Sequence, residues 1–221
     1  EPKDFWPKDS LARMLESAFH TDADVARQAW QDWLGSVDFD TAPWAEMRLL
    51  PAVLRRQKQL GVEVPRIPRI DGVKRYIWTA SQTNLHAARP LLAALEEHDV
   101  PFMVLKGGAR HLEDNSAGDR YIADVDILVP RHRFFEVLDI AESAKWSWTW
   151  DVNREWLDMY FLSARHSLGL RRDTAPQEVD IHAHSLLLNR CADDDDGLWR
   201  RARQAKTGGI ACLVPDRTDQ L

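Results

Sequence analysis

A short apolar segment that carries two aspartates, residues 123–129, constrains this chain more than any other feature. Side chains of a β-strand alternate between the two faces of a sheet, so Asp124 and Asp126 share one face while Val125, Ile127 and Val129 point into the core. Two carboxylates held side by side repel each other, and a divalent cation with oxygen ligands relieves that repulsion. The segment therefore predicts a strand with a magnesium or manganese site. Taken alone, the pair would also fit an exposed strand edge protected by charge.

A second segment, residues 178–184, repeats this alternation nearer the C-terminus. It places Asp180, His182 and His184 on one face and apolar side chains on the other. If this strand lies beside the first, Asp180 would complete a three-carboxylate site able to hold two metal ions, the arrangement used in phosphoryl transfer. The two histidines would orient Asp180, bind substrate, act as acid or base, or serve as structural hydrogen-bonding groups.

A glycine turn precedes both aspartate strands. Residues 101–105 form an apolar run, typical of a buried strand, that ends at Lys106-Gly107-Gly108, and a helix is expected from Ala109. In such a turn the glycine N–H groups and the helix N-terminus approach a phosphate closely. A glycine pair alone is a weak signal, but the turn, the aspartate pair and the later aspartate in this order are more specific.

The N-terminal part of the chain, residues 1–99, has a helical pattern. Apolar residues at helical spacing predict helices over residues 21–35, about 43–61 and 71–97. Prolines in residues 62–70 indicate a linker, and Pro90 is expected to kink or divide the last helix. Trp30, Trp33, Trp44 and Trp78 fall on the apolar faces, so we expect them in a core.

The C-terminal part, residues 100–221, mixes strands and helices. Further strands are expected at residues 146–150 and 164–171, with helices at 133–143 and 198–205. A turn through residues 173–176 would join the last two strands as a hairpin, and the acidic run 193–196 is expected to be a solvated turn. This order predicts an α+β fold with a mixed β-sheet and two regions, 1–99 and 100–221.

Charge and composition restrict the partners. Lys and Arg number 29 and Asp and Glu 35, and a net charge of −6 does not suit a broad phosphate-binding surface, so long nucleic acid is not an expected partner. No stretch is apolar for the roughly 18 residues of a membrane span, and residues 1–10 lack the layout of a signal peptide. We therefore expect a cytoplasmic protein without a membrane partner. The two cysteines lack CxxC spacing and are expected to be free thiols.

Four motifs taken together resemble a known superfamily. They are Leu105-Lys106-Gly107-Gly108-Ala109, Asp119-Arg120, Asp124-Val125-Asp126-Ile127-Leu128-Val129 and Val179-Asp180-Ile181-His182. In this order they are similar to the nucleotidyltransferase superfamily of DNA polymerase beta type, most of all to its branch of largely uncharacterised bacterial nucleotidyltransferases. The resemblance covers about residues 100 to 215. It implies a helical N-terminal region packed on a polymerase-beta-like nucleotidyltransferase core. One departure is Gly108, which stands where the superfamily usually has a serine.

The resemblance also implies roles for individual residues. Asp124, Asp126 and Asp180 would be the catalytic residues that coordinate Mg²⁺ (or Mn²⁺). His182 would orient these carboxylates without binding the metal itself. The triphosphate group of the nucleotide would lie against Gly107 and Gly108, and Lys106 or Arg120 would neutralise its charge. Members of this type typically continue with further helices after Pro215, so we expect either a core truncated at the C-terminus or a degenerate member.

The implied reaction is a magnesium-dependent transfer of a nucleoside monophosphate from a nucleoside triphosphate to a hydroxyl, with ATP as the expected nucleotide. A small molecule, a carbohydrate or a protein side chain would suit an acidic domain as acceptor, and tRNA stays open. The alternative from another class is a noncatalytic nucleotide-sensing or scaffold protein that retains the fold, with the Trp-rich helices as its partner surface.

Overall fold

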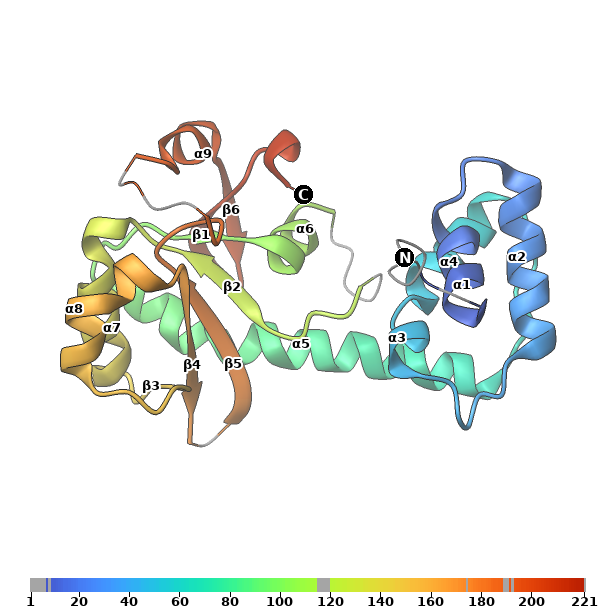
Figure 1. Ribbon diagram of the computed structural model, residues 1–221, viewed down its shortest axis with the longest axis horizontal. Helices are drawn as coiled ribbons and strands as arrows, with labels where there is room; N and C mark the ends of the chain where they lie inside the picture. Colours follow the sequence, from blue (N-terminus) through green and yellow to red (C-terminus); the bar gives the residue numbers. More distant parts are fainter. Residues whose placement is uncertain are drawn as a thin grey trace, which may run out of the picture. The chain divides into compact units, whose positions relative to one another are not determined.

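The chain forms two compact units in a computed structural model, which describes residues 7, 9–114, 120–173, 175–188, 191 and 193–220 (Figure 1). The first unit comprises residues 1–81 and 117–121, and the second comprises residues 82–116 and 122–221. The boundary falls inside the long helix α5 (Pro68–Glu97), which contributes to both units. Asp119 of the Asp119-Arg120 motif and Thr174 of the expected hairpin turn lie outside the described residues.

The described part of the first unit is helical, as the sequence predicts. Its helices are α1 (Asp9–Phe19), α2 (Ala23–Ser36), α3 (Trp44–Met47), α4 (Leu50–Gln59) and the first part of α5. The single helix expected over residues 43–61 is wrong, because α4 is a separate helix that begins at Leu50. Pro51, which lacks an N–H, lies in its first turn. For the same reason α5 begins within the expected linker, at Pro68. Pro90 lies inside α5 without dividing it.

Tryptophans form only part of the core of this unit. Trp30 and Trp33 are fully buried and stack with their ring centroids 5.4 Å apart. The expectation that Trp44 and Trp78 are also in the core is wrong, because they are 40% and 50% exposed. Trp44 instead packs its ring edge-on to Tyr76, so apolar spacing on a helix did not separate core from surface aromatics.

A mixed seven-stranded sheet forms the centre of the second unit. Its strands are β1 (Met103–Val104), β2 (Val125–Leu128), β3 (Ser147–Trp148), β4 (Ser167–Arg172), β5 (Ala175–His182), β6 (Arg203–Thr207) and β7 (Ile210–Val214). They lie in the order β3-β4-β5-β2-β1-β7-β6. β5 is parallel to β2 and β1 is parallel to β7, whereas the other neighbours are antiparallel. The expected α+β class with a mixed sheet is confirmed, and so is the β4–β5 hairpin.

Helices lie on both faces of this sheet. They are α6 (Lys106–Asp114), α7 (Phe134–Ser143), α8 (Arg154–Ala164) and α9 (Asp196–Arg201), with the short 3₁₀ turns η2 (Arg131–Arg133) and η3 (Arg217–Asp219). The C-terminal half of α5, α7 and α8 share one core with the sheet, which includes Val125 and Val179 (Figure 1). On the other face, Leu198 and Trp199 of α9 pack against Leu128. In the described part of the chain, no helix is long and apolar enough to cross a membrane.

Two elements near the C-terminus differ from expectation. The helix expected over residues 198–205 ends at Arg201, and the chain continues into the β6–β7 hairpin. Gly208 and Gly209 form its two-residue turn with φ of 57° and 95°, and positive φ at both positions is the geometry that such hairpins require. The glycine pair was therefore a usable signal that the sequence analysis missed. It also missed helix α8.

Candidate active site

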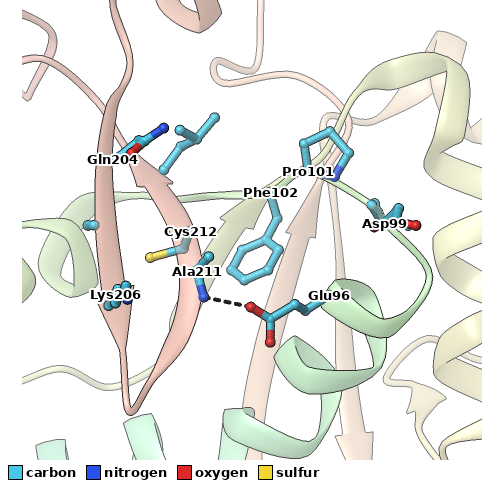
Figure 2. A pocket seen from close by; sticks show the side chains of 11 residues that line it. Glu96, Asp99, Pro101, Phe102, Gln204, Lys206, Ala211 and Cys212 are labelled. Atoms are coloured by element: carbon cyan, nitrogen blue, oxygen red, sulfur yellow. Dashed lines mark hydrogen bonds between the residues drawn. The ribbon is translucent and has the colours of Figure 1, made fainter.

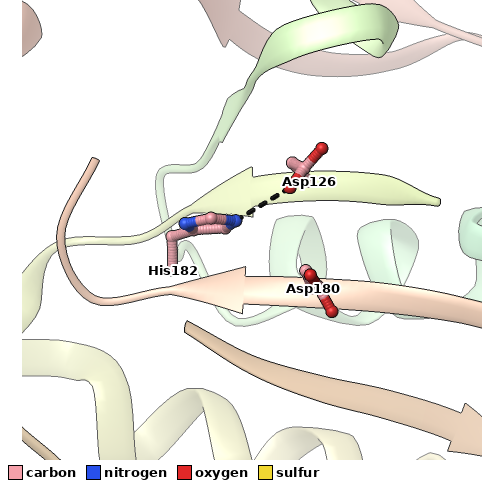
Figure 3. A group of neighbouring side chains, drawn as sticks. All are labelled: Asp126, Asp180 and His182. Carbon is pink, nitrogen blue, oxygen red and sulfur yellow. Dashed lines mark hydrogen bonds and ion pairs between the residues drawn. The ribbon is translucent and has the colours of Figure 1, made fainter. Parts of the chain in front are cut away.

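Asp126 and Asp180 lie opposite each other on neighbouring parallel strands. The register of β2 and β5 pairs Val125 with Val179 and Asp126 with Asp180. The apolar partners lie in the core shared with α5, α7 and α8, so alternation directs both carboxylates to the other face. The adjacency that the sequence analysis had to assume is present, and Figure 3 shows the two aspartates together with His182.

Asp126 is the most enclosed of the three aspartates. It is 3% exposed, and its Oδ1 lies 2.9 Å from His182 Nε2 and forms an ion pair with Lys106 Nζ. Burial pushes the pKa of Asp126 upward, but the hydrogen bonds and charges of His182 and Lys106 outweigh burial and leave the pKa below its usual value. Asp126 is therefore an ionised carboxylate. Of the roles open to His182, orienting an aspartate fits, although its contact is Asp126 and not Asp180.

Asp180 has the opposite electrostatic balance. Burial and then the negative charges of Asp124 and Asp126 raise its pKa. One ligand atom each from Asp126, Asp180 and His182 lies within 4.8 Å of the others. Burial is the larger cause of this raised pKa, but a divalent cation would offset the repulsion among the carboxylates, so the residues present fit such an ion. Asp124, at the bend before β2, influences Asp180 through its charge but does not belong to this close group.

The Lys106-Gly107-Gly108 motif starts helix α6 directly. The expectation of a turn followed by a helix from Ala109 is wrong by one turn, since α6 begins at Lys106. Lys106 has a φ of 48°, in the left-handed region that is costly for a residue with a side chain. Gly108 lies against β1, where a Cβ would meet Val104 Cγ1 at 2.7 Å. The absence of the serine side chain found in the superfamily motif therefore allows a close approach of α6 to β1.

Arg120 belongs to the first unit, whereas the carboxylates belong to the second. Its backbone carbonyl accepts a hydrogen bond from Ser81 Oγ at 3.3 Å. Its role in phosphate binding stays a prediction.

Two residues near the carboxylates were missed by the sequence analysis. Gly169 pairs with Asp180 across β4 and β5, and a Cβ there would lie 3.2 Å from Asp180 Oδ1 and 2.8 Å from Thr149 Oγ1. A glycine inside a strand is a known sign of such close approach. The buried Asn84 of α5 donates hydrogen bonds to the backbone just before Asp124. Nothing in a helical sequence pattern distinguishes it.

A polar cluster follows the site along the strands. His184 Nε2 accepts a hydrogen bond from Arg131 Nε at 3.2 Å, and His184 Nδ1 lies 3.7 Å from Asp195 Oδ2. Asp195 also accepts a hydrogen bond from Ser185 N at 3.0 Å and is 7% exposed. The expectation that the whole acidic run 193–196 is solvated is therefore wrong, because Asp195 anchors the start of α9 to the end of β5. Of these residues, Arg131, His184 and Asp195 line a cavity of about 290 Å³ together with Trp199.

A larger cavity, of about 730 Å³, lies between the end of α5 and the β6–β7 hairpin (Figure 2). Glu96 Oε1 accepts a hydrogen bond from Ala211 N at 2.9 Å beside Phe102 and Cys212. None of the predicted site residues lines this cavity, so its volume does not mark the chemical centre.

The mixed sheet with paired aspartates on neighbouring strands agrees with the nucleotidyltransferase resemblance of the sequence. The chain belongs to a family described as uncharacterised nucleotidyltransferase, whose model matches residues 42–221. The match thus includes helices that the sequence resemblance left out. No curated protein matches the chain. Among solved structures, ANT(2″)-Ia in complex with adenylyl-2″-tobramycin is 14% identical, with a TM-score of 0.42, and the alignment covers 61% of this chain and 70% of that one.

Proposed function

We propose that this nucleotidyltransferase moves a nucleoside monophosphate from a nucleoside triphosphate to a hydroxyl, with Mg²⁺ or Mn²⁺ as the required metal. The observation that carries the proposal is the parallel pairing of Asp126 with Asp180, which places two carboxylates side by side. Burial first, and then the negative charges of Asp124 and Asp126, raise the pKa of Asp180. Burying repelling carboxylates destabilises a fold, so the arrangement indicates a cation.

The proposed ligands are Asp126 and Asp180, held by the sheet, and Asp124, which precedes β2. His182 keeps Asp126 oriented and ionised through their 2.9 Å contact. A bound divalent ion supplies Lewis-acid stabilisation of the charge that develops on the phosphoryl oxygens. The contribution of each aspartate is therefore a carboxylate that the fold holds in position for this ion.

The triphosphate is assigned to the start of α6. The N–H groups of a helix N-terminus attract phosphate, and α6 begins with Lys106, Gly107 and Gly108. The Lys106 side chain is 51% exposed while its ammonium contacts Asp126, so it lies beside both the solvent and the carboxylates. This position suits a cation that neutralises phosphate charge. Arg120 is a second candidate for that role.

The acceptor is proposed to be a small molecule, a carbohydrate or a protein hydroxyl, with tRNA as a remaining possibility, and ATP is the proposed donor. A cytoplasmic location belongs to the same proposal. The net charge of −6 supports an acceptor other than long nucleic acid, because long nucleic acid binds through excess Lys and Arg.

The proposal is tested by thermal shift with each nucleoside triphosphate, with and without Mg²⁺, on the wild type, Asp126→Asn and the control Asp158→Asn. Asp158 is a half-exposed carboxylate on α8 that pairs with Arg154. A ligand that binds the native state raises Tm. We expect a shift that requires both metal and nucleotide in the wild type and the control, and none in Asp126→Asn. The nucleotide so identified, labelled at the α-phosphate, then serves to search for acceptors.

If no triphosphate shifts the wild type with Mg²⁺ or Mn²⁺, the catalytic proposal is wrong. The noncatalytic scaffold role would then be favoured.

A further inference from the structure

The three site aspartates are held in different ways. Asp126 and Asp180 lie within the paired part of β2 and β5, so ladder hydrogen bonds fix their backbones. Asp124 is at a bend one residue before β2 begins, and the register of β2 with β5 starts only at Val125. Its position therefore depends on how the preceding residues are held.

One side chain hydrogen-bonds to both residues that directly precede Asp124. Asn84 Nδ2 donates to the carbonyl oxygen of Ile122 at 2.7 Å and to that of Ala123 at 2.8 Å. An amide nitrogen carries two protons, so both are used on these two consecutive carbonyls. Ile122 and Ala123 are the two residues immediately before Asp124, and neither lies in a helix or strand.

The burial of this contact makes it costly to lose. Asn84 is 9% exposed, the Ile122 side chain is 5% exposed, and the Asn84 contact to Ile122 is buried. A buried carbonyl left without a donor is unfavourable, so the segment would move to find another partner. Such a movement would be transmitted along the backbone to Asp124 first, because the paired strand after it resists displacement.

We propose that Asn84 is a positioning residue that places the Asp124 carboxylate for binding of the divalent metal ion. Two hydrogen bonds of the Asn84 amide go to the two residues that precede Asp124, the one aspartate of the three that the β2–β5 ladder does not fix. This inference rests on the proposed metal-dependent function.

The test measures Mn²⁺ affinity of the whole chain without nucleotide, by electron paramagnetic resonance titration. Asn84→Ala should weaken Mn²⁺ binding roughly 10-fold, the lower end of the range for groups that support metal ligands. Asn84→Ser, which keeps one donor proton, should fall in between and serves in place of Asn84→Ala if that variant does not fold.

A double-mutant cycle separates positioning from general destabilisation. Replacing Asn84 in an Asp124→Ala background should cause no further loss of Mn²⁺ affinity, because Asn84 acts only through Asp124. The matched control is Arg89→Ala on the same helix. Arg89 Nη2 also donates to a backbone carbonyl, that of Gly208 at 2.7 Å, but in the β6–β7 hairpin. Arg89→Ala should leave the Mn²⁺ affinity unchanged while lowering Tm.

The outcomes are distinguishable. Unchanged Mn²⁺ affinity in Asn84→Ala and Asn84→Ser, or an equal loss with and without Asp124, overturns the positioning role while the metal site stands. If wild type and Asp126→Asn bind Mn²⁺ equally weakly, the proposed metal-dependent function itself fails, and the inference fails with it.

Discussion

Asp126 and Asp180 occupy paired positions on adjacent parallel strands, yet their electrostatic environments are opposed. Asp126 has cationic and hydrogen-bonding neighbours in Lys106 and His182, which lower its pKa. Asp180 is left with burial and with the charges of Asp124 and Asp126, which raise its pKa. The site thus holds one carboxylate whose charge is compensated within the protein and one that gains most from an added cation.

Replacing Asp180 should stabilise the metal-free protein. Because the folded pKa of Asp180 is raised, the folded state binds its proton more tightly than the unfolded state, and stability falls as pH rises from the ordinary to the raised pKa. Asp180→Asn removes this cost, so we expect Tm at pH 7 to rise by about 1 to 3 °C while the difference shrinks toward pH 3. Calorimetry in chelator checks this, with Asp158→Asn as the control that brings no gain. A lower Tm for Asp180→Asn at pH 7 would contradict it.

Replacing His182 should weaken metal binding through Asp126. The 2.9 Å contact from His182 helps to hold the pKa of Asp126 down, so His182→Gln lets that pKa rise and frees the carboxylate to rotate. We expect Mn²⁺ affinity to fall by about 10- to 100-fold, and the loss to grow as pH decreases and protons compete for Asp126. Titrations at pH 5 and pH 7 test this. His98→Gln, an exposed histidine bonded to Ala94 O, should behave as wild type.

Adding a methyl group at Gly108 should destabilise the second unit. The new Cβ would approach Val104 Cγ1 at 2.7 Å, and a β-branched side chain has little freedom to move away. We expect Gly108→Ala to lower the free energy of unfolding by about 1 to 3 kcal/mol, and Val104→Ala to relieve part of this loss in the double variant.

The control for that substitution is Gly72→Ala, also in a helix but with open space around the position. It should raise the free energy of unfolding by roughly 0.5 to 1 kcal/mol, because alanine favours helices. Urea denaturation of the three variants gives the answer, and equal effects at both glycines would show that the Val104 contact is unimportant.

The protein should lose stability in alkaline solution through Cys212. Burial raises the pKa of this thiol from 9.0 to about 11. Between these values the unfolded thiol ionises while the folded thiol stays neutral, so stability decreases as pH rises from 9 to 11. Cys212→Ala should flatten the dependence of Tm on pH in this window. Thiol reagents should modify the exposed Cys191 in the native protein and Cys212 only after unfolding.

Sequence periodicity was enough to predict each of the two strands that carry the site. The alternation around Asp126 and Asp180 is local information, and the register of β2 with β5 agrees with it. What the pattern lacked was the partner of each strand, because pairing is decided by the rest of the sheet. The contacts of His182 and Lys106 with Asp126 follow from that pairing, so they could not be specified beforehand.

Other features depended on information that periodicity does not contain. Trp30 and Trp44 have similar apolar surroundings in sequence, but one is fully buried and the other is 40% exposed. In the sequence Asn84 looks like any polar residue on a long helix. Its role depends on hydrogen bonds to the carbonyls of Ile122 and Ala123, which are distant in sequence. The Gly208-Gly209 turn is different, since the glycine pair was a sufficient local signal for a hairpin and was not used.

The two outer strands of the sheet have a consequence for solution behaviour. β3 contains only two residues, and β6 at the other edge exposes Gln204 and Lys206. Both edges oppose the addition of a strand from another chain. At β3 the new ladder would be short, and at β6 it would bury the charge of a lysine. Concentrated stocks of this protein should therefore resist fibril formation from the native state, and self-association by continuation of the sheet is disfavoured.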